Sequence, residues 1–280
     1  MRHSLLLTIA LLGSLALSAC GDSDKQVQEA LQDVNVIDES NLNDLMLTVG
    51  DPEEAVAYFA GASQQNPERI DLKRGLAKSL IRAGKTTEGV SVWRQVVASP
   101  EHTNNDRVAL ADALIRSNDW VGATAELNLI PPTFETFERY RLEAMVADSN
   151  KDWGKSDSFY EIAVGLTTKP AGVLNNWGFS KLTRGDAKGA EKLLIEALTY
   201  DSGMFTAKNN LVLARATQGK YELPVVDMTQ TERAELLYTM ALAAIKKGDT
   251  AVGKRLLQES IDTHPQYFEA AARSLAALEG

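Results

Sequence analysis

The stretch Asn175–Leu198 reads NNWGFSKLTRGDAKGAEKLLIEAL, and it consists of two segments of helical periodicity joined by a short turn. Gly185 lies at the turn, where glycine readily takes the left-handed backbone conformation that ends a helix. Asp186 follows it, and an aspartate side chain can accept hydrogen bonds from the first N–H groups of the next helix. The stretch therefore predicts two helices joined by a tight turn and packed antiparallel.

The same pattern recurs along the chain. Turn residues align at spacings of 34, 34, 33, 34, 34 and 29 residues: Gly50, Gly84, Asn118, Lys151, Gly185, Gly219 and Gly248. Seven residues before each turn stand mostly small side chains: Asn43, Ala77, Ala111, Ala144, Gly178, Val212 and Ala241. Nine residues after each turn stand bulky apolar side chains: Phe59, Trp93, Leu127, Tyr160, Leu194, Met228 and Leu257. A period of about 34 residues with this alternation is the signature of the tetratricopeptide repeat (TPR), and it predicts an all-α TPR solenoid.

About seven helix-turn-helix units are expected, with the first and last as caps. Aspartates are expected to cap the second helix of five units: Asp51, Asp119, Asp152, Asp186 and Asp249. Lysine takes the left-handed conformation less readily than glycine or asparagine, so the turn at Lys151 is expected to differ in detail. Pro131 and Pro132 should end the second helix of the third unit early, because proline cannot continue a helix interior.

The sixth unit is interrupted. Five residues after the turn, the other units carry small residues: Ala55, Gly89, Ala123, Ser156, Ala190 and Gly253. Pro224 occupies this position in the sixth unit, and the next turn residue arrives five residues early. Proline there excludes an ordinary helix, while Leu223, Val225 and Met228 are too apolar for a free loop. We expect an extended or turn-like segment packed on the solenoid, followed by a helix that begins near Thr229 to Glu232 with a capping box.

The other end of the chain carries an export signal. Residues 1–19 contain a basic start, an apolar run and small residues, which together are typical of a secretory signal peptide. Leu17, Ser18, Ala19 and Cys20 resemble the bacterial lipobox, in which the cysteine is acylated and becomes the new N-terminus. Cys20 is the only cysteine, so no intramolecular disulfide is possible. The alternative is an ordinary signal peptide with a chance cysteine.

The lipid on Cys20 is the only non-protein group expected, and no cofactor is predicted. Several acyl chains contribute ~0.8 kcal/mol per buried CH₂ and would anchor the protein stably. By resemblance to lipoprotein sorting rules, Gly21 favours the outer membrane, with the mature chain facing the periplasm. The predicted domains are a signal peptide (1–19), a lipidated N-terminus with an acidic tether (20–35) and the TPR superhelix (36–280).

Charge is concentrated near the tether. Residues 21–54 contain ten acidic residues and one lysine, a balance that equals the net charge of -9 of the whole chain. The remainder is close to neutral and has no basic excess, so nucleic acid is not an expected partner. The sequence also contains no HExxH, Walker A, GxSxG or GxGxxG motif. His102 and His264 are expected in turns without metal-ligand spacing, and the four tryptophans are expected in the core, so neither an enzyme, a metal site nor a small-molecule substrate is predicted.

A TPR array presents a concave face, lined mainly by the first helix of each unit, to a peptide or helix of a protein partner. Asparagine amides on this face can pair with both N–H and C=O of an extended backbone. In peptide-binding TPR proteins, an asparagine at the position of Asn176 and Asn210 does this, and lysines clamp a terminal carboxylate. The candidate groove residues are Arg141, Asn175, Asn176, Lys208, Asn209 and Asn210. The alternative is that these asparagines only finish helix ends or fill a solvated groove.

Three segments resemble the TadD-type TPR lipoproteins of the tight-adherence (Tad, or Flp-type) pilus system. They begin at Asn175, Phe205 and Thr263, and the most specific string is GKYELPVVDMTQTERAELLY from Gly219. The resemblance implies an outer-membrane lipoprotein that serves as an interaction scaffold for the pilus secretion machinery, including an outer-membrane secretin as a partner. Such pili mediate adherence and biofilm formation.

Two alternatives remain from the sequence. One is another TPR lipoprotein adaptor, either a pilotin of a different pilus or secretion system or a scaffold for cell-wall enzymes. The other is an enzyme with an appended TPR array, for which the repeats leave no unassigned domain of catalytic size.

Overall fold

The computed structural model describes residues 42–278, and these residues contain helices and no strand. Residues 42–48 form a first helical segment. The helices that follow are α2 (Pro52–Gln65), α3 (Ile70–Arg82), α4 (Thr86–Ala98), α5 (Asn104–Arg116), α6 (Trp120–Asn128), α7 (Phe137–Ser149), α8 (Trp153–Gly165), α9 (Ala171–Thr183), α10 (Ala187–Tyr200), α11 (Phe205–Thr217), α12 (Gln230–Lys247), α13 (Thr250–Thr263) and α14 (Glu269–Ala276). The all-α prediction is confirmed for this part of the chain.

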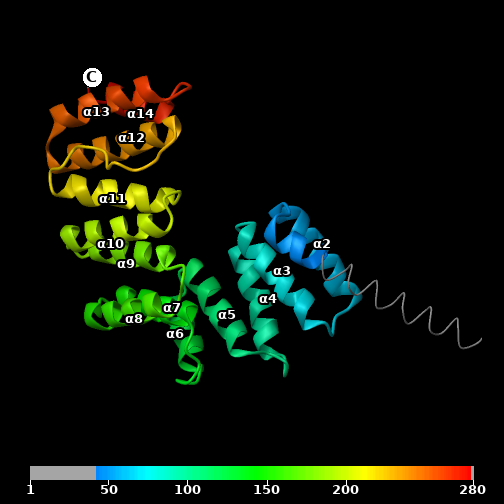
Figure 1. Ribbon diagram of the computed structural model, residues 1–280. Coiled ribbons are helices and arrows are strands. Elements are labelled where there is room, and N and C mark those ends of the chain that lie inside the picture. The colour runs from blue at the N-terminus through cyan, green and yellow to red at the C-terminus, as the bar shows by residue number, and fades with distance from the viewer. Residues whose placement is uncertain (1–41, 279–280) are drawn as a thin grey trace, which may run out of the picture. The chain divides into compact units, whose positions relative to one another are not determined.

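The chain divides into two compact units, one ending at His102 and the other beginning at Thr103. In the N-terminal unit, α3 packs against both α2 and α4. In the C-terminal unit, sequential helices from α5 to α14 pack on one another, with the closest pairings within helical hairpins such as α9 with α10 and α12 with α13. Figure 1 shows α9 to α14 as successive antiparallel layers within this unit.

The hairpin turns repeat one geometry. Six turn residues have positive φ angles between 59° and 99°: Gly84, Asn118, Lys151, Gly185, Gly219 and Gly248. At Lys151 the following residue, Asp152, donates its backbone N–H to the carbonyl of Ala147 over 2.9 Å, as Asp186 does to Lys181. The expectation that the Lys151 turn differs is therefore wrong, because the packing of α7 on α8 imposes the left-handed conformation on lysine. Gly50 is the exception, because its φ is not positive and its own N–H bonds to Leu45.

The aspartate caps form at four of the five predicted positions. Side-chain oxygens accept backbone N–H groups at the start of α2, α6, α8 and α10, from Asp51, Asp119, Asp152 and Asp186. The prediction for Asp249 is wrong, because this side chain makes no cap bond to α13. Asp249 instead accepts a hydrogen bond from the hydroxyl of Tyr221, which raises the pKa of Tyr221 to about 12.

Small and large positions of the repeat meet inside the hairpins. The large side chains of regular units are buried with at most 4% exposure: Phe59, Trp93, Leu127, Tyr160, Leu194 and Leu257. Opposite them the small residues permit close approach, since a Cβ added to Gly178 would lie 2.7 Å from Cγ of Leu194. The second helix of the third unit is shortened as predicted, because α6 ends at Asn128, before Pro131 and Pro132.

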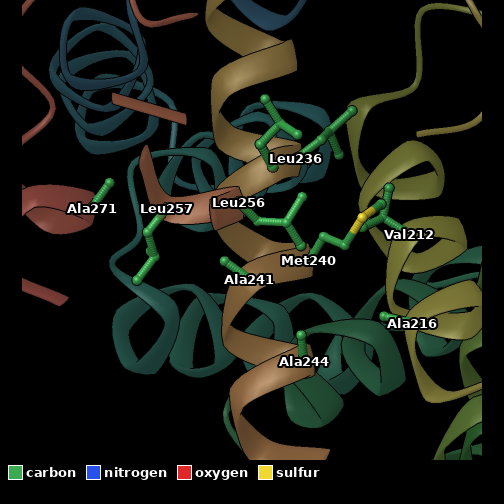
Figure 2. Packing of buried hydrophobic residues seen from close by; sticks show 10 residues of the cluster. Val212, Ala216, Leu236, Met240, Ala241, Ala244, Leu256, Leu257 and Ala271 are labelled. Atoms are coloured by element: carbon green, nitrogen blue, oxygen red, sulfur yellow. The ribbon is translucent and has the colours of Figure 1, made fainter. Parts of the chain in front are cut away.

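The interruption of the sixth unit has the predicted character. The α11–α12 connection (residues 218–229) contains no helix, and Pro224 is buried within it. Tyr221, Leu223 and Met228 pack on the cluster formed by buried residues of α11, α12, α13 and α14. Figure 2 shows the centre of this cluster, where Met240 points from α12 toward Val212 and Leu256 extends from α13 toward Met240. The connection thus covers apolar surface that a second helix covers in regular units.

Helix α12 begins at Gln230 behind a complete capping box. The Glu232 N–H donates to the Thr229 hydroxyl over 3.1 Å, and the Thr229 N–H donates to the Glu232 carboxylate over 2.8 Å. This confirms the predicted start of the last regular unit.

Candidate binding groove

A groove of about 510 Å³ opens within the C-terminal unit. Residues of α7, α9 and α11, the first helices of three successive units, supply most of its lining, and Trp120 of α6 and Tyr160 of α8 contribute the rest. All four predicted asparagines line this groove: Asn175, Asn176, Asn209 and Asn210. The repeat explains why they meet, because residues separated by one period occupy equivalent positions on neighbouring helices.

The asparagines are linked across the helices. Asn210 donates its Nδ2 hydrogen to Oδ1 of Asn175 over 3.0 Å. The hydroxyl of Thr239 on α12 donates to Oδ1 of Asn209 over 2.8 Å, and Nδ2 of Asn176 lies 3.7 Å from Sδ of Met145. These contacts orient the four amides, so that less conformational entropy remains to be lost when a ligand binds.

Each amide retains one group without a hydrogen-bond partner among residues 42–278. Asn175 and Asn209 retain their Nδ2 donors, whereas Asn176 and Asn210 retain their Oδ1 acceptors. Two neighbouring helices thus each present one donor and one acceptor. An extended polypeptide backbone presents the complementary C=O and N–H groups.

The predicted cations do not join the asparagines. Nη2 of Arg141 lies 2.9 Å from Oδ1 of Asp112, and Arg141 does not line the groove. The ammonium of Lys208 lies 3.3 Å from the carboxylate of Glu232, and its side chain is only 3% exposed. The sequence offered these two residues as groove cations, and the structure places neither of them in the lining. Both charges are neutralised by carboxylates on adjacent helices.

Asp148 of α7 lines the groove and was not predicted from the sequence. Its Oδ1 accepts hydrogen bonds from the hydroxyls of Ser156 over 2.5 Å and Ser180 over 2.7 Å, and its Oδ2 accepts from Tyr160 over 3.0 Å. Burial, reinforced by the Asp148 charge and hydrogen bond, raises the pKa of Tyr160 well above its usual range, so that its hydroxyl remains a donor. Three hydroxyls from α8 and α9 therefore hold the carboxylate in place.

Aromatic side chains complete the lining. Phe179 is 49% exposed, and Phe205 and Trp120 are partly exposed beside it. Sequence reasoning placed Trp120 in the core and did not single out Phe179. The repeat register could have indicated Phe179. This residue lies one helical turn after Asn175 and Asn176 on α9. It also follows Gly178, which faces α10.

The remaining predicted sites lie elsewhere. Leu17, Ser18, Ala19 and Cys20 fall outside the described residues. Within residues 42–278 no helix combines the length and the apolar character needed to cross a membrane. In the same part of the chain no group of three or more His, Cys, Asp or Glu side chains is arranged to hold a metal ion.

No protein-family model matches the chain, and no curated protein matches it. Several solved structures are similar to it. The APC/C hetero-tetramer Cut9-Hcn1 aligns with a TM-score of 0.60 and 13% identity over 84% of this chain and 47% of the other chain, so that the present chain spans about half of that length. A tetratricopeptide repeat protein from Parabacteroides merdae aligns with a TM-score of 0.58 and 10% identity over 86% of this chain and 97% of the other.

A human IFIT1 dimer solved with PPP-AAAA aligns with a TM-score of 0.58 and 15% identity, over 81% of this chain and 59% of the other. At such low identity these similarities concern the fold alone. The more specific resemblance to TadD-type lipoproteins stays a prediction. The structure of the chain is that of the TPR solenoid proteins.

Proposed function

We propose that this protein is a non-enzymatic interaction scaffold whose C-terminal unit binds an extended segment of a partner protein. The observation that supports this most directly is the set of four oriented amides, which leaves two donors and two acceptors free in one groove. Main-chain recognition of this kind provides affinity without demanding one particular side-chain sequence. The aromatic lining adds apolar surface for side chains of the bound segment.

We further propose that the scaffold acts as a lipid-anchored protein of the outer membrane, facing the periplasm, in assembly or localisation of a Tad pilus secretion machinery, with the secretin among its partners. The support is the lipobox at Cys20 and the resemblance of the chain around Gly219 to TadD-type lipoproteins. Anchoring both scaffold and partner near one membrane raises their effective concentration and strengthens a weak groove interaction.

A second candidate is a TPR lipoprotein adaptor for a different pilus or for cell-wall enzymes. The same groove would serve it, and the lipobox supports it equally. Genes for a secretin, a pilus ATPase and small prepilins beside this one favour the Tad assignment, whereas genes for cell-wall enzymes favour the adaptor.

The groove is tested by crosslinking in cells. A photoreactive phenylalanine analogue replaces Phe179, which lines the groove, and a matched variant carries it at Tyr267, which is 77% exposed and does not line the groove. We expect a pilus or secretin subunit to be crosslinked from position 179 and not from position 267. The Asn175→Ala/Asn210→Ala double variant should abolish that adduct, while Asn104→Ala/Asn105→Ala, an asparagine pair outside the groove, should not. Equal crosslinking from both positions would refute the groove.

The anchoring and the cellular role have separate tests. Cys20→Ser should release the protein from outer-membrane fractions, and unchanged fractionation would refute lipid anchoring. Deletion of the gene should abolish surface pili while prepilin is still made. Normal piliation in the deletion strain would refute the assembly role.

A further inference from the structure

The groove contains a carboxylate that forms no ion pair with any described residue. Asp148 is the only charged side chain among the residues that line it, and no cationic side chain forms an ion pair with Asp148 within residues 42–278. Its three partners are neutral hydroxyls. They orient the carboxylate and partly replace water, but they do not neutralise its charge.

Two other partly buried aspartates of the C-terminal unit, Asp112 and Asp157, differ in this respect. Asp112 lies 2.6 Å from Nε of Arg116 and 2.9 Å from Nη2 of Arg141. Asp157 pairs with Lys181 over 3.0 Å and with Arg184. Both aspartates join neighbouring helices through cations, as expected where a carboxylate is partly removed from water. Asp148 lies at a similar junction, between α7, α8 and α9, yet it lines the groove and forms no ion pair with a described residue.

The two cations whose charges act on Tyr160, the hydrogen-bond partner of Asp148, are paired with other carboxylates: Arg141 with Asp112 and Arg184 with Asp157. Lys208 is buried against Glu232. A ligand carboxylate would meet Asp148 with no lysine or arginine in the lining to offset the repulsion. A ligand cation would instead gain a charge-assisted contact in a site of reduced solvent access.

We propose that the groove selects an internal, basic segment of its protein partner, in which a lysine or arginine side chain pairs with Asp148. This inference rests on the proposed function, since the backbone of the segment crosses the four amides. An apolar side chain next to the cation packs on Phe179. A partner's C-terminal carboxylate is disfavoured by like charge, and so is the acidic tether of this chain.

The test uses the detergent-solubilised full chain and a bead-displayed library of random ten-residue peptides with amidated C-termini. The wild-type protein is expected to enrich peptides with lysine or arginine at one position. Affinity for a selected peptide should fall on the order of tenfold in Asp148→Asn, because the charge pair is lost. Asp227→Asn makes the same charge change at an exposed site outside the groove and should leave affinity unchanged.

A second variant tests the same charge pair in case Asp148→Asn does not fold. Ser149 is exposed, lines the groove beside Asp148 and lies in the last turn of α7, where a cation is tolerated. Ser149→Lys should therefore fold and weaken the same peptide, since its ammonium competes for the carboxylate.

The outcomes separate the two proposals. The charge inference fails if the selected peptides require Asn175 and Asn210 but show no preference for basic residues. It also fails if they bind Asp148→Asn and Ser149→Lys as tightly as wild type. Either result leaves the proposed groove function standing. A preference for free C-terminal carboxylates, or binding only after residues 21–41 are removed, also overturns it. Absence of any peptide whose binding depends on Asn175 and Asn210 overturns both.

Discussion

Lys208 of α11 and Glu232 of α12 form an ion pair across the interrupted repeat, with the Lys208 ammonium 3.3 Å from both carboxylate oxygens. The lysine side chain is 3% exposed and that of Glu232 is 22% exposed. Glu232 also accepts the Thr229 N–H in the capping box of α12. One carboxylate therefore starts a helix and neutralises a buried charge where the second helix of the sixth unit is missing.

Replacing Glu232 with alanine removes both interactions. We expect Glu232→Ala to lower the free energy of unfolding by about 2–4 kcal/mol, because the cap is lost and Lys208 is left buried without its partner. Urea denaturation monitored by circular dichroism measures this change.

Adding Lys208→Met to Glu232→Ala should recover part of the loss, since an apolar side chain of similar length removes the unpaired charge. Glu235→Ala on the same helix serves as the control and should change stability by less than about 0.5 kcal/mol. No recovery in the double variant would show that the buried lysine is not what destabilises Glu232→Ala.

The ion pairs of Asp157 make the stability of the fold sensitive to acid. Burial raises its pKa, but hydrogen bonds from Arg184, Trp177 and Lys181 outweigh burial and hold the pKa of this carboxyl below its ordinary value. The unfolded chain therefore binds this proton more readily than the folded protein. The stabilisation is complete above the unfolded pKa of about 4 and is lost as the pH falls through the folded pKa.

We expect Asp157→Asn to be about 1–3 kcal/mol less stable than wild type near neutral pH, because donors on α9 lose a charged acceptor. The difference should shrink below about pH 4, where the wild-type carboxyl becomes protonated. Urea titrations at a series of pH values measure it, with the exposed Asp227→Asn as control. A difference independent of pH would contradict the role of the charge.

Gly178 of α9 tests the close packing of the repeat. Alanine is the better helix former by about 1 kcal/mol, yet its Cβ would lie 2.7 Å from Cγ of buried Leu194. We expect Gly178→Ala to lower the melting temperature, at a net cost of about 1–2 kcal/mol, because Leu194 cannot shift freely. Gly172→Ala on the same helix meets nothing within 4 Å and should be neutral or stabilising. A stable Gly178→Ala protein would show that the hairpin separates at little cost.

The packing of the α11–α12 connection predicts effects of different size at two nearby apolar residues. Leu223 packs on the cluster around Met240, whereas Val225 is fully exposed. We expect Leu223→Ala to cost about 1–2 kcal/mol and Val225→Ala less than about 0.5 kcal/mol, as measured by thermal unfolding. Equal effects would indicate that the connection does not pack as described.

Much of the fold could be predicted because the turns depend on neighbouring residues. Gly185 and Asp186 end one helix and begin the next through backbone conformation and one short-range hydrogen bond. Thr229 and Glu232 begin α12 through the reciprocal hydrogen bonds of a capping box. Pro224 excludes a helix for a covalent reason, so the interruption is also visible in the sequence.

Local propensity was insufficient where tertiary contacts compete with it. Lys151 takes a conformation that lysine disfavours, and its turn has the same backbone hydrogen bond as the turn at Gly185. Asp249 gives up its expected cap because Tyr221, 28 residues earlier in the chain, reaches its carboxylate.

Some features of the candidate groove could likewise be predicted from the sequence, and others could not. Repeat spacing aligns Asn175 with Asn209 and Asn176 with Asn210, so the meeting of Asn175 and Asn210 in one groove follows from the sequence. Their cross-helix hydrogen bond, the burial of Lys208 and the unpaired charge of Asp148 follow only from the tertiary structure. The physical reason is that a period specifies which face a residue occupies, whereas its net charge and free hydrogen-bonding groups depend on which side chains of adjacent helices come within bonding distance.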